Sequence, residues 1–130
     1  MTELNVGDQI QGLKVTPDKY LPHRYAGASG DFNPIHIDPE FAKAVGLPST
    51  ILHGLYMMGL TARAAAEAAG GDPRSLKRLS VQFRGMGAPE TEIAVTGSVK
   101  SVEGGKMTID VVAAQGDTET IKNAEAEVAL

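Results

Sequence analysis

Cysteine is absent from the 130-residue sequence. A chain without thiols has no disulfide scaffold, no thiolate nucleophile, no cysteine-ligated zinc site and no cysteine-held iron–sulfur cluster. The absence fits a reducing compartment. The first residues, Met1 to Asn5, also lack a basic segment followed by an apolar run, so no export signal is visible. We therefore predict a cytoplasmic protein.

An excess of positive charge is also lacking, because 12 Lys and Arg residues stand against 16 Asp and Glu residues, for a net charge of −4. The chain as a whole has no electrostatic attraction to a nucleic-acid backbone. The longest uncharged stretch, between Lys43 and Arg63, contains Pro48, His53 and other polar groups that a bilayer would leave unpaired. We expect neither nucleic acid nor a membrane as partner, and we interpret this stretch as a buried element with a functional entrance.

The 130 residues, 42% of them hydrophobic, have the size and apolar content of one globular domain, so we expect a single domain over residues 1–130. Leu52 to Ala69 is the strongest helix, rich in Leu, Met and Ala and followed by two glycines. It is apolar nearly all round, so we expect it to be covered on most sides. Three weaker elements precede it: a strand over Ile10–Val15, a helix that begins near Thr16 or Pro22 and ends by Gly30, and a short helix over Pro39–Val45.

The second half of the chain alternates between apolar and polar residues, which predicts half-buried strands. The alternation covers residues 79–84, 93–100 and 107–111, and Gly104–Gly105 is a tight hairpin signal. Ile121–Leu130 has the composition of a helix, but its alternation favours one more antiparallel strand. These elements predict an α+β fold in which a sheet of at least four antiparallel strands wraps the apolar helix.

The densest group of polar residues is the segment Tyr25 to Asp38, YAGASGDFNPIHID. A turn with a rigid proline separates Asp31 from His36, so the carboxylate and the imidazole meet if the loop folds back. Such a pair holds one water between an acceptor and a group that exchanges protons near neutrality. The alternative is that Asp31 only stabilises the loop by capping the following turn.

Other roles for the neighbouring polar residues are also open. His36, Asp38 and His53 offer metal ligands, but no second histidine lies at helical or strand spacing from His36, so we expect no metal. Asp38 precedes Pro39 and Glu40 and is interpreted as a helix N-cap. His23 is interpreted as a solvated residue.

Gly54 follows His53 at the start of the strong helix. A glycine there lets a ligand approach the first backbone N–H groups, which stabilise a developing enolate oxygen. The alternative is that Gly54 only permits tight packing. Met57 and Met58 line an acyl channel or belong to the core. Four basic residues either bind the phosphates of the acyl carrier or form a solvated face: Arg74, Lys77, Arg78 and Arg84.

The segment YAGASGDFNPIHID, with His53–Gly54 opening a long apolar helix, resembles the MaoC-like hydratase family over essentially the whole chain. That family includes (R)-specific enoyl-CoA hydratases and (3R)-hydroxyacyl-ACP dehydratases. The resemblance implies a hot-dog fold, with the motif on an overhanging segment that covers an acyl tunnel. It further implies that Asp31 and His36 are the catalytic dyad, that the Gly54 N–H is the oxyanion donor and that Asn33, grouped with Gly54 at the substrate site, holds the loop. Two positions depart from the family pattern, Gly59 and Pro22.

The implied reaction is reversible syn addition of water to a trans-2-enoyl thioester, giving a (3R)-hydroxyacyl thioester in fatty-acid metabolism, with no cofactor. The carrier, CoA or acyl carrier protein, the acyl length, the physiological direction and the separate proton-transfer roles of Asp31 and His36 stay open. The competing interpretations are a hot-dog acyl thioesterase and a non-catalytic acyl-binding subunit. We also expect a dimer, either with an identical chain or with a diverged subunit that lacks the dyad, and the complete dyad here favours the homodimer.

Overall fold

The computed structural model describes residues 4–130. A short first strand, three small helices and one long helix precede a 3₁₀ turn and four longer strands. In chain order these are β1 (Leu13–Val15), α1 (Leu21–Ser29), α2 (Pro34–Ile37), α3 (Pro39–Ala44), α4 (Gly54–Ala68), η1 (Pro73–Ser75), β2 (Leu76–Phe83), β3 (Ile93–Glu103), β4 (Lys106–Gln115) and β5 (Thr118–Ala129).

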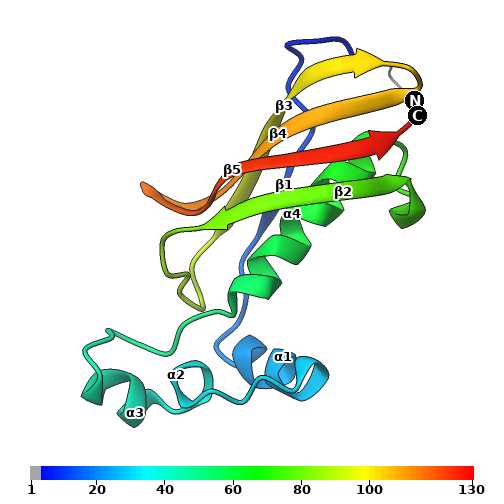
Figure 1. Ribbon diagram of the computed structural model, residues 1–130. Coiled ribbons are helices and arrows are strands. Elements are labelled where there is room, and N and C mark those ends of the chain that lie inside the picture. Colours follow the sequence, from blue (N-terminus) through cyan, green and yellow to red (C-terminus); the bar gives the residue numbers. More distant parts are fainter. Residues whose placement is uncertain (1–3) are drawn as a thin grey trace.

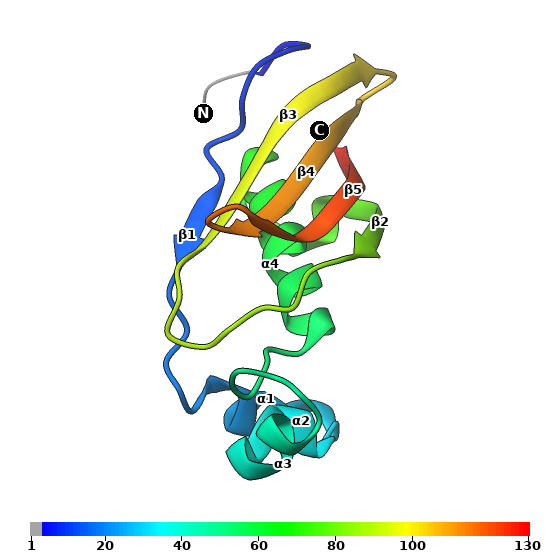
Figure 2. The same cartoon turned by 90° about the vertical axis from the view of Figure 1, so that its left-hand side faces the viewer.

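Five antiparallel strands form one sheet in the order β1-β3-β4-β5-β2. The sheet curves along α4, and the small helices lie beyond the end of the sheet, beside the start of α4 (Figures 1 and 2). We call residues 21–44, which contain α1, α2 and α3, the overhang. This arrangement confirms the predicted α+β class with a sheet wrapped around a long helix.

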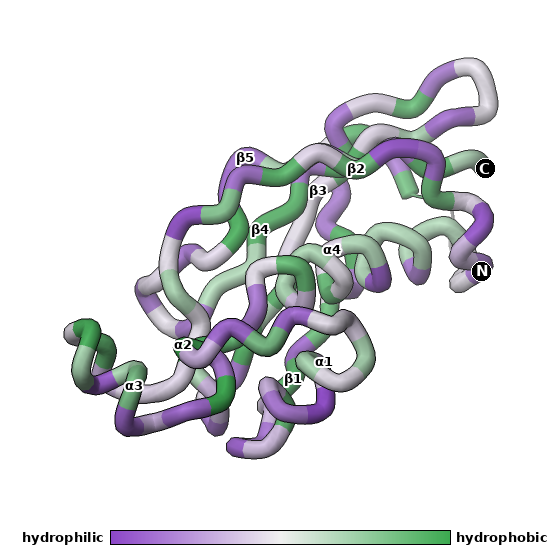
Figure 3. Tube along the Cα trace, turned by 60° about the horizontal axis from the view of Figure 1, so that its bottom comes forward, coloured by the Kyte–Doolittle hydropathy of each residue, from purple (hydrophilic) through white to green (hydrophobic). Residues whose placement is uncertain are grey.

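The hydrophobic core lies between α4 and the sheet. Met57, Ala64 and Ala65 of α4 are buried against it, so Met57 belongs to the core, as one of its two interpretations held. In Figure 3, α4 is mainly pale green, whereas the overhang carries long hydrophilic stretches. The largest fully buried strand side chains are Ile93, Val95, Met107, Ile109, Val111, Ile121 and Val128.

The last predicted strand is confirmed, although its composition suits a helix. In β5, Ala124, Ala126 and Val128 are buried and alternate with half-buried glutamates. Pairing with both β4 and β2 outweighs helix propensity, which is a weak preference that tertiary context overrides. The β3–β4 hairpin is confirmed as well, and Gly104 and Gly105 turn at φ 59° and 73°, the left-handed values that favour glycine in a two-residue hairpin.

The first strand is shorter than predicted. Only Leu13–Val15 is a strand, while Gln9 makes a single bridge to Ser98 and the Ile10 N–H donates to the Gly97 carbonyl. Gly12 interrupts the alternation because its φ is 68°. Pro22, in contrast, fits the structure easily. It lies in the first turn of α1, where a missing N–H breaks no helical bond.

The long helix begins two residues later than predicted and ends one residue earlier, at Gly54–Ala68. The helix is covered on most sides, as expected, and is exposed along one stripe with helical spacing, Leu55, Gly59, Arg63 and Glu67. Leu55 is 62% exposed. Within residues 4–130, no helix combines the length and the apolar character that a membrane span requires.

Candidate active site

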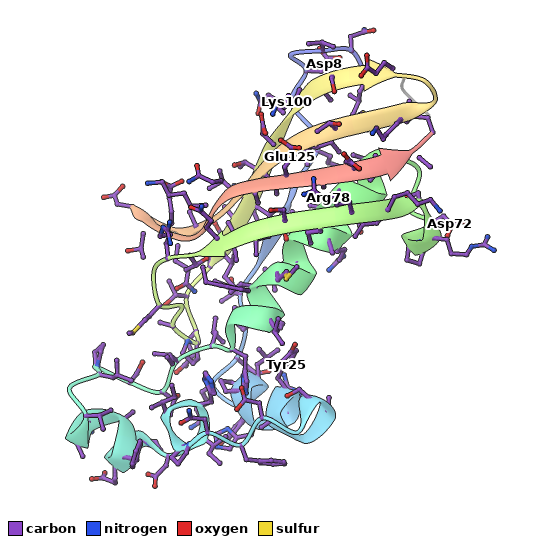
Figure 4. The ribbon with its side chains drawn as sticks, in the orientation of Figure 1. Asp8, Tyr25, Asp72, Arg78, Lys100 and Glu125 are labelled. Carbon is purple, nitrogen blue, oxygen red and sulfur yellow. The ribbon has the colours of Figure 1, made fainter. Side chains whose placement is uncertain are left out.

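A pocket of about 280 Å³ opens between the overhang and the N-terminus of α4. It is lined by Tyr25, Ser29, Asp31, His53, Gly54, Leu55 and Phe83. Tyr25 meets Tyr56 edge-on, with ring centroids 5.8 Å apart. Burial raises the pKa of the Tyr56 hydroxyl, so this hydroxyl is uncharged at neutral pH. In Figure 4 Tyr25 lies on the side of the overhang that faces the start of α4.

Asp31 is positioned by the end of α1. The helix ends at Gly30, whose φ of 82° is left-handed and whose N–H donates to the Ala26 carbonyl. The Asp31 N–H then donates to Ser29 Oγ at 3.2 Å, and Asp31 Oδ1 accepts the Asn33 N–H at 3.2 Å. The carboxylate therefore caps the turn with Oδ1 and keeps Oδ2 for another partner. The capping interpretation and the catalytic interpretation are compatible because they use different oxygens.

His36 is more enclosed than its predicted place on a loop indicates. The turn continues into α2, which starts with Pro34 and is capped by Asn33, whose Oδ1 accepts the Ile35 N–H at 3.2 Å. The His36 side chain is 9% exposed, against 53% for that of Asp31. Asn33 thus holds the loop. It is not one of the residues that line the pocket, and its contact with a substrate stays a prediction.

One ring nitrogen of His36 is already used. His36 Nδ1 lies 2.8 Å from the Ile51 carbonyl oxygen. A carbonyl only accepts, so Nδ1 carries the proton and Nε2 presents a lone pair in the neutral ring. Nε2 faces Asp31 Oδ2 at 3.8 Å, which is too long for a direct hydrogen bond. The structure therefore brings the two predicted dyad residues together, with two acceptor atoms facing each other.

His53 is the site residue whose part sequence reasoning missed. Its Nε2 lies 3.0 Å from the Asp31 carbonyl oxygen, and its ring stacks on the His36 ring with centroids 3.8 Å apart and planes 20° apart. The sequence alone indicates His53 only as a metal-ligand candidate and as the neighbour of Gly54. The sequence signal that could have indicated His53 is its place directly before Gly54, because a residue next to the helix start lies close to the same site.

A metal ion fits this group poorly. Asp31, His36 and His53 offer ligand atoms within 4.8 Å of one another. However, carbonyl oxygens already occupy one nitrogen of each ring. The remaining lone pairs of the two stacked rings also lie in ring planes only 20° apart, whereas a tetrahedral zinc site needs its lone pairs to converge on one point.

Gly54 opens α4, and its N–H is one of the first-turn donors that have no intrahelical acceptor. A Cβ at this position would lie 3.1 and 3.2 Å from two ring carbons of Phe83, at the end of β2. Phe83 is 48% exposed and lines the same pocket. The glycine thus keeps space between the helix start and the Phe83 ring, which agrees with the packing interpretation, and Gly54 itself lines the pocket.

The remaining candidates lie elsewhere. Asp38 is confirmed as an N-cap, since its Oδ1 accepts the N–H groups of Glu40 and Phe41 at the start of α3. His23 is exposed, as expected, and its Nε2 donates to the Ile37 carbonyl.

The four basic residues of the predicted phosphate-binding set do not line the pocket. Arg74 pairs with Asp72 beyond the far end of α4, and Arg78 lies on β2 well away from Tyr25 (Figure 4). Arg84 is the member next to Phe83, and it donates to Gln82.

Known proteins are similar to this chain both in sequence and in architecture. A model of the MaoC like domain family matches residues 5–121. The fatty acid synthase beta subunit hexB of Dothistroma septosporum is 36% identical over 108 residues, which are 82% of this chain and 6% of that protein. The peroxisomal enoyl-CoA hydratase 2 of Arabidopsis thaliana is 48% identical over 71 residues, which are 54% of this chain and 22% of that enzyme. The chain therefore spans only a small part of these relatives.

A solved structure gives the same architecture. The (R)-hydratase from A. caviae involved in PHA biosynthesis superposes with a TM-score of 0.88 at 22% identity, over 100% of this chain and 99% of that one. At this identity the likeness shows the fold alone, a hot-dog fold. With the family match over residues 5–121, it leads to the conclusion that the chain belongs to the MaoC-like dehydratase family.

Proposed function

We propose that this chain catalyses the reversible (R)-specific hydration of trans-2-enoyl thioesters, and in reverse the dehydration of (3R)-hydroxyacyl thioesters. The observation that carries this function is the pair of facing acceptors, Asp31 Oδ2 and His36 Nε2, which lie 3.8 Å apart, with Asp31 lining the pocket. The activity named for the Arabidopsis relative supports the same chemistry.

Two facing acceptors suit one water molecule, which has two O–H donors. A water that donates to both Oδ2 and Nε2 directs an oxygen lone pair away from them, toward C3 of a bound enoyl group. The Ile51 carbonyl fixes the tautomer in which Nε2 is free to accept.

In hydration, the water oxygen forms a bond to C3 as one of its O–H bonds breaks toward the dyad. The C2=C3 electron pair moves onto the thioester as an enolate, and C2 then takes a proton from the dyad. Because both groups lie on one short segment, the hydroxyl and the proton arrive on the same face. No electrons leave the substrate, so the step is balanced without an oxidant or reductant.

The enolate oxygen needs a donor, and the Gly54 N–H at the start of α4 supplies one together with the helix dipole. Removing one oxyanion donor typically costs ~2.7–4 kcal/mol of the barrier. Gly54 and Asp31 line the same pocket. A thioester whose carbonyl oxygen meets Gly54 therefore presents its C2=C3 bond toward Asp31.

Asp31→Asn and His36→Asn are each expected to lower turnover at least ~10²-fold, which is the lower end of what a positioned acid or base contributes. Both variants keep the structural bonds, because the amide introduced at position 31 retains an oxygen for the Asn33 N–H and the amide introduced at position 36 retains a donor for the Ile51 carbonyl. His36→Ala is a poorer test because this side chain is buried. The measurement is loss of enoyl absorbance with crotonyl-CoA and longer enoyl thioesters.

A free-thiol assay on the same samples separates the competing functions. A thioesterase releases the carrier thiol, whereas a hydratase consumes the C2=C3 double bond and releases no thiol. Near-full hydratase activity in either variant would contradict the dyad. Absence of any turnover in the unsubstituted protein would leave only the acyl-binding function.

Gly54→Ala is expected to lower turnover by ~10²-fold, the effect of losing one oxyanion donor. The N–H remains, but the new methyl presses on Phe83 and obstructs the approach to the donor. Gly27→Ala in α1 is the matched control, since a Cβ there meets nothing within 4 Å. Gly27 lies inside α1, where alanine favours helix over glycine by about 1 kcal/mol, so the control variant should melt no lower than the parent. Equal activity of the two variants would show that Gly54 is not part of the active site.

The product is expected to be the (3R)-hydroxyacyl thioester. The same-face geometry follows from Asp31 and His36 on one segment, and the family with its (R)-hydratase fold relative indicates which face. The test couples the product of trans-2-enoyl thioester hydration to a (3S)-specific dehydrogenase. Coupling should be negligible, and robust coupling would refute the stereochemical assignment. Running a chain-length series on CoA and on acyl carrier protein in the same assay identifies the carrier.

The partner is a second copy of this chain. Strand β2 forms one edge of the sheet and pairs only with β5 among residues 4–130. Beside this edge the chain exposes large apolar side chains at the pocket, Leu55 at 62% and Phe83 at 48%. An unpaired edge next to exposed apolar surface favours association. The complete dyad supports an identical partner rather than a diverged one.

Sedimentation velocity should therefore give a particle of twice the 13.6 kDa of one chain. Activity should fall as dilution separates the subunits, because the exposed pocket residues lie on the side that the partner covers. A stable monomer with full activity would rule out the dimer. The cytoplasmic location stays a prediction.

A further inference from the structure

His53 is a buried ionisable side chain that the steps above do not use. It is 2% exposed and precedes α4 as its N-cap residue, yet its side chain makes no capping bond to the helix. A buried ring that does not cap its helix needs another explanation for its place.

One hydrogen bond and one unpartnered nitrogen determine the tautomer of His53. Nε2 lies 3.0 Å from the Asp31 carbonyl oxygen, an acceptor, so Nε2 carries a proton. Nδ1 is buried and has no hydrogen-bond partner within residues 4–130. A proton on Nδ1 would be a buried donor without an acceptor, which is costly. His53 is therefore a neutral ring with its proton on Nε2.

The same ring touches both members of the dyad. It donates to the main chain of Asp31 and stacks on His36 with centroids 3.8 Å apart. Its own orientation is held by Tyr25, whose ring centroid lies 4.7 Å away. A neutral ring next to His36 also avoids the repulsion that two imidazolium ions with centroids 3.8 Å apart would have when His36 holds a proton.

We infer that His53 is a positioning residue: as a neutral Nε2–H imidazole it fixes the Asp31 main chain and the His36 ring plane, and so sets the 3.8 Å separation of the two acceptor atoms. This role rests on the proposed hydratase function. It differs from a general structural role because it requires one particular tautomer and affects turnover more than substrate binding.

Two substitutions separate the donor from the ring. His53→Gln keeps an N–H donor at the position of Nε2 and loses the stacked ring, while His53→Phe keeps a stacked ring and leaves the Asp31 carbonyl without its donor. We expect His53→Phe to lower kcat by ~10²-fold with KM changed less than about threefold, as a displaced reacting group does. His53→Gln should recover at least about tenfold of that loss. His23→Gln, at an exposed histidine that donates to the Ile37 carbonyl and lies outside the pocket, is the control and should match the parent.

A spectroscopic measurement tests the tautomer independently of activity and of how the variants fold. The chain has three histidines, so ¹⁵N ring spectra of the labelled protein are readily assigned with single substitutions. We expect His53 as Nε2–H and His36 as Nδ1–H when both rings are neutral. A His53 ring in the Nδ1–H form overturns the inference, as does equal kcat loss in His53→Gln and His53→Phe, or none in His53→Phe. If the parent shows no hydration, the function fails while the ring spectra still decide the state of His53.

Discussion

The site depends on a set of hydrogen bonds that tie the overhang to the segment just before α4. The Ile51 N–H donates to the Ile35 carbonyl, His36 Nδ1 donates to the Ile51 carbonyl, and His53 Nε2 donates to the Asp31 carbonyl. These bonds join residues 15 or more positions apart in the sequence. Without them the dyad and the helix start would belong to separate parts of the molecule. With them, Asp31, His53 and Gly54 line one pocket, and His36 Nε2 lies 3.8 Å from Asp31 Oδ2.

The overhang relies on such polar bonds because it shares little of the hydrophobic core. The core cluster lies between α4 and the sheet, and from the overhang only Leu21 packs against it. Each hydrogen bond between buried groups adds only modestly to the free energy of unfolding. A buried donor or acceptor left without its partner lowers that free energy by more than one such bond raises it. The motif residues are therefore held in one geometry by mutual satisfaction, which keeps reacting groups in place better than a flexible loop would.

Several motif residues serve the fold and the chemistry at the same time. Asp31 caps a turn with one oxygen and faces His36 with the other. His36 links α2 to the chain before α4 through one nitrogen and presents the second to Asp31. The structural and the catalytic interpretations of the motif are therefore compatible. One accounts for Asp31 Oδ1 and His36 Nδ1, and the other for Asp31 Oδ2 and His36 Nε2.

The sequence by itself determined the elements whose pattern is local. Alternation predicted the strands and their hairpin, and the Ala- and Met-rich run predicted α4 to within two residues, because side-chain period follows backbone geometry directly. Asp31, His36 and Gly54 stood out through their residue types and the turn between them.

Tertiary structure alone decided three matters. The helical turn that buries His36 depends on a carbonyl at Ile51, which no local pattern reveals. The exposed stripe of α4 depends on how far the sheet reaches around it. The place of His53 between Asp31 and His36 depends on two segments meeting 22 residues apart, and contacts at that separation are set by packing rather than by neighbouring residues.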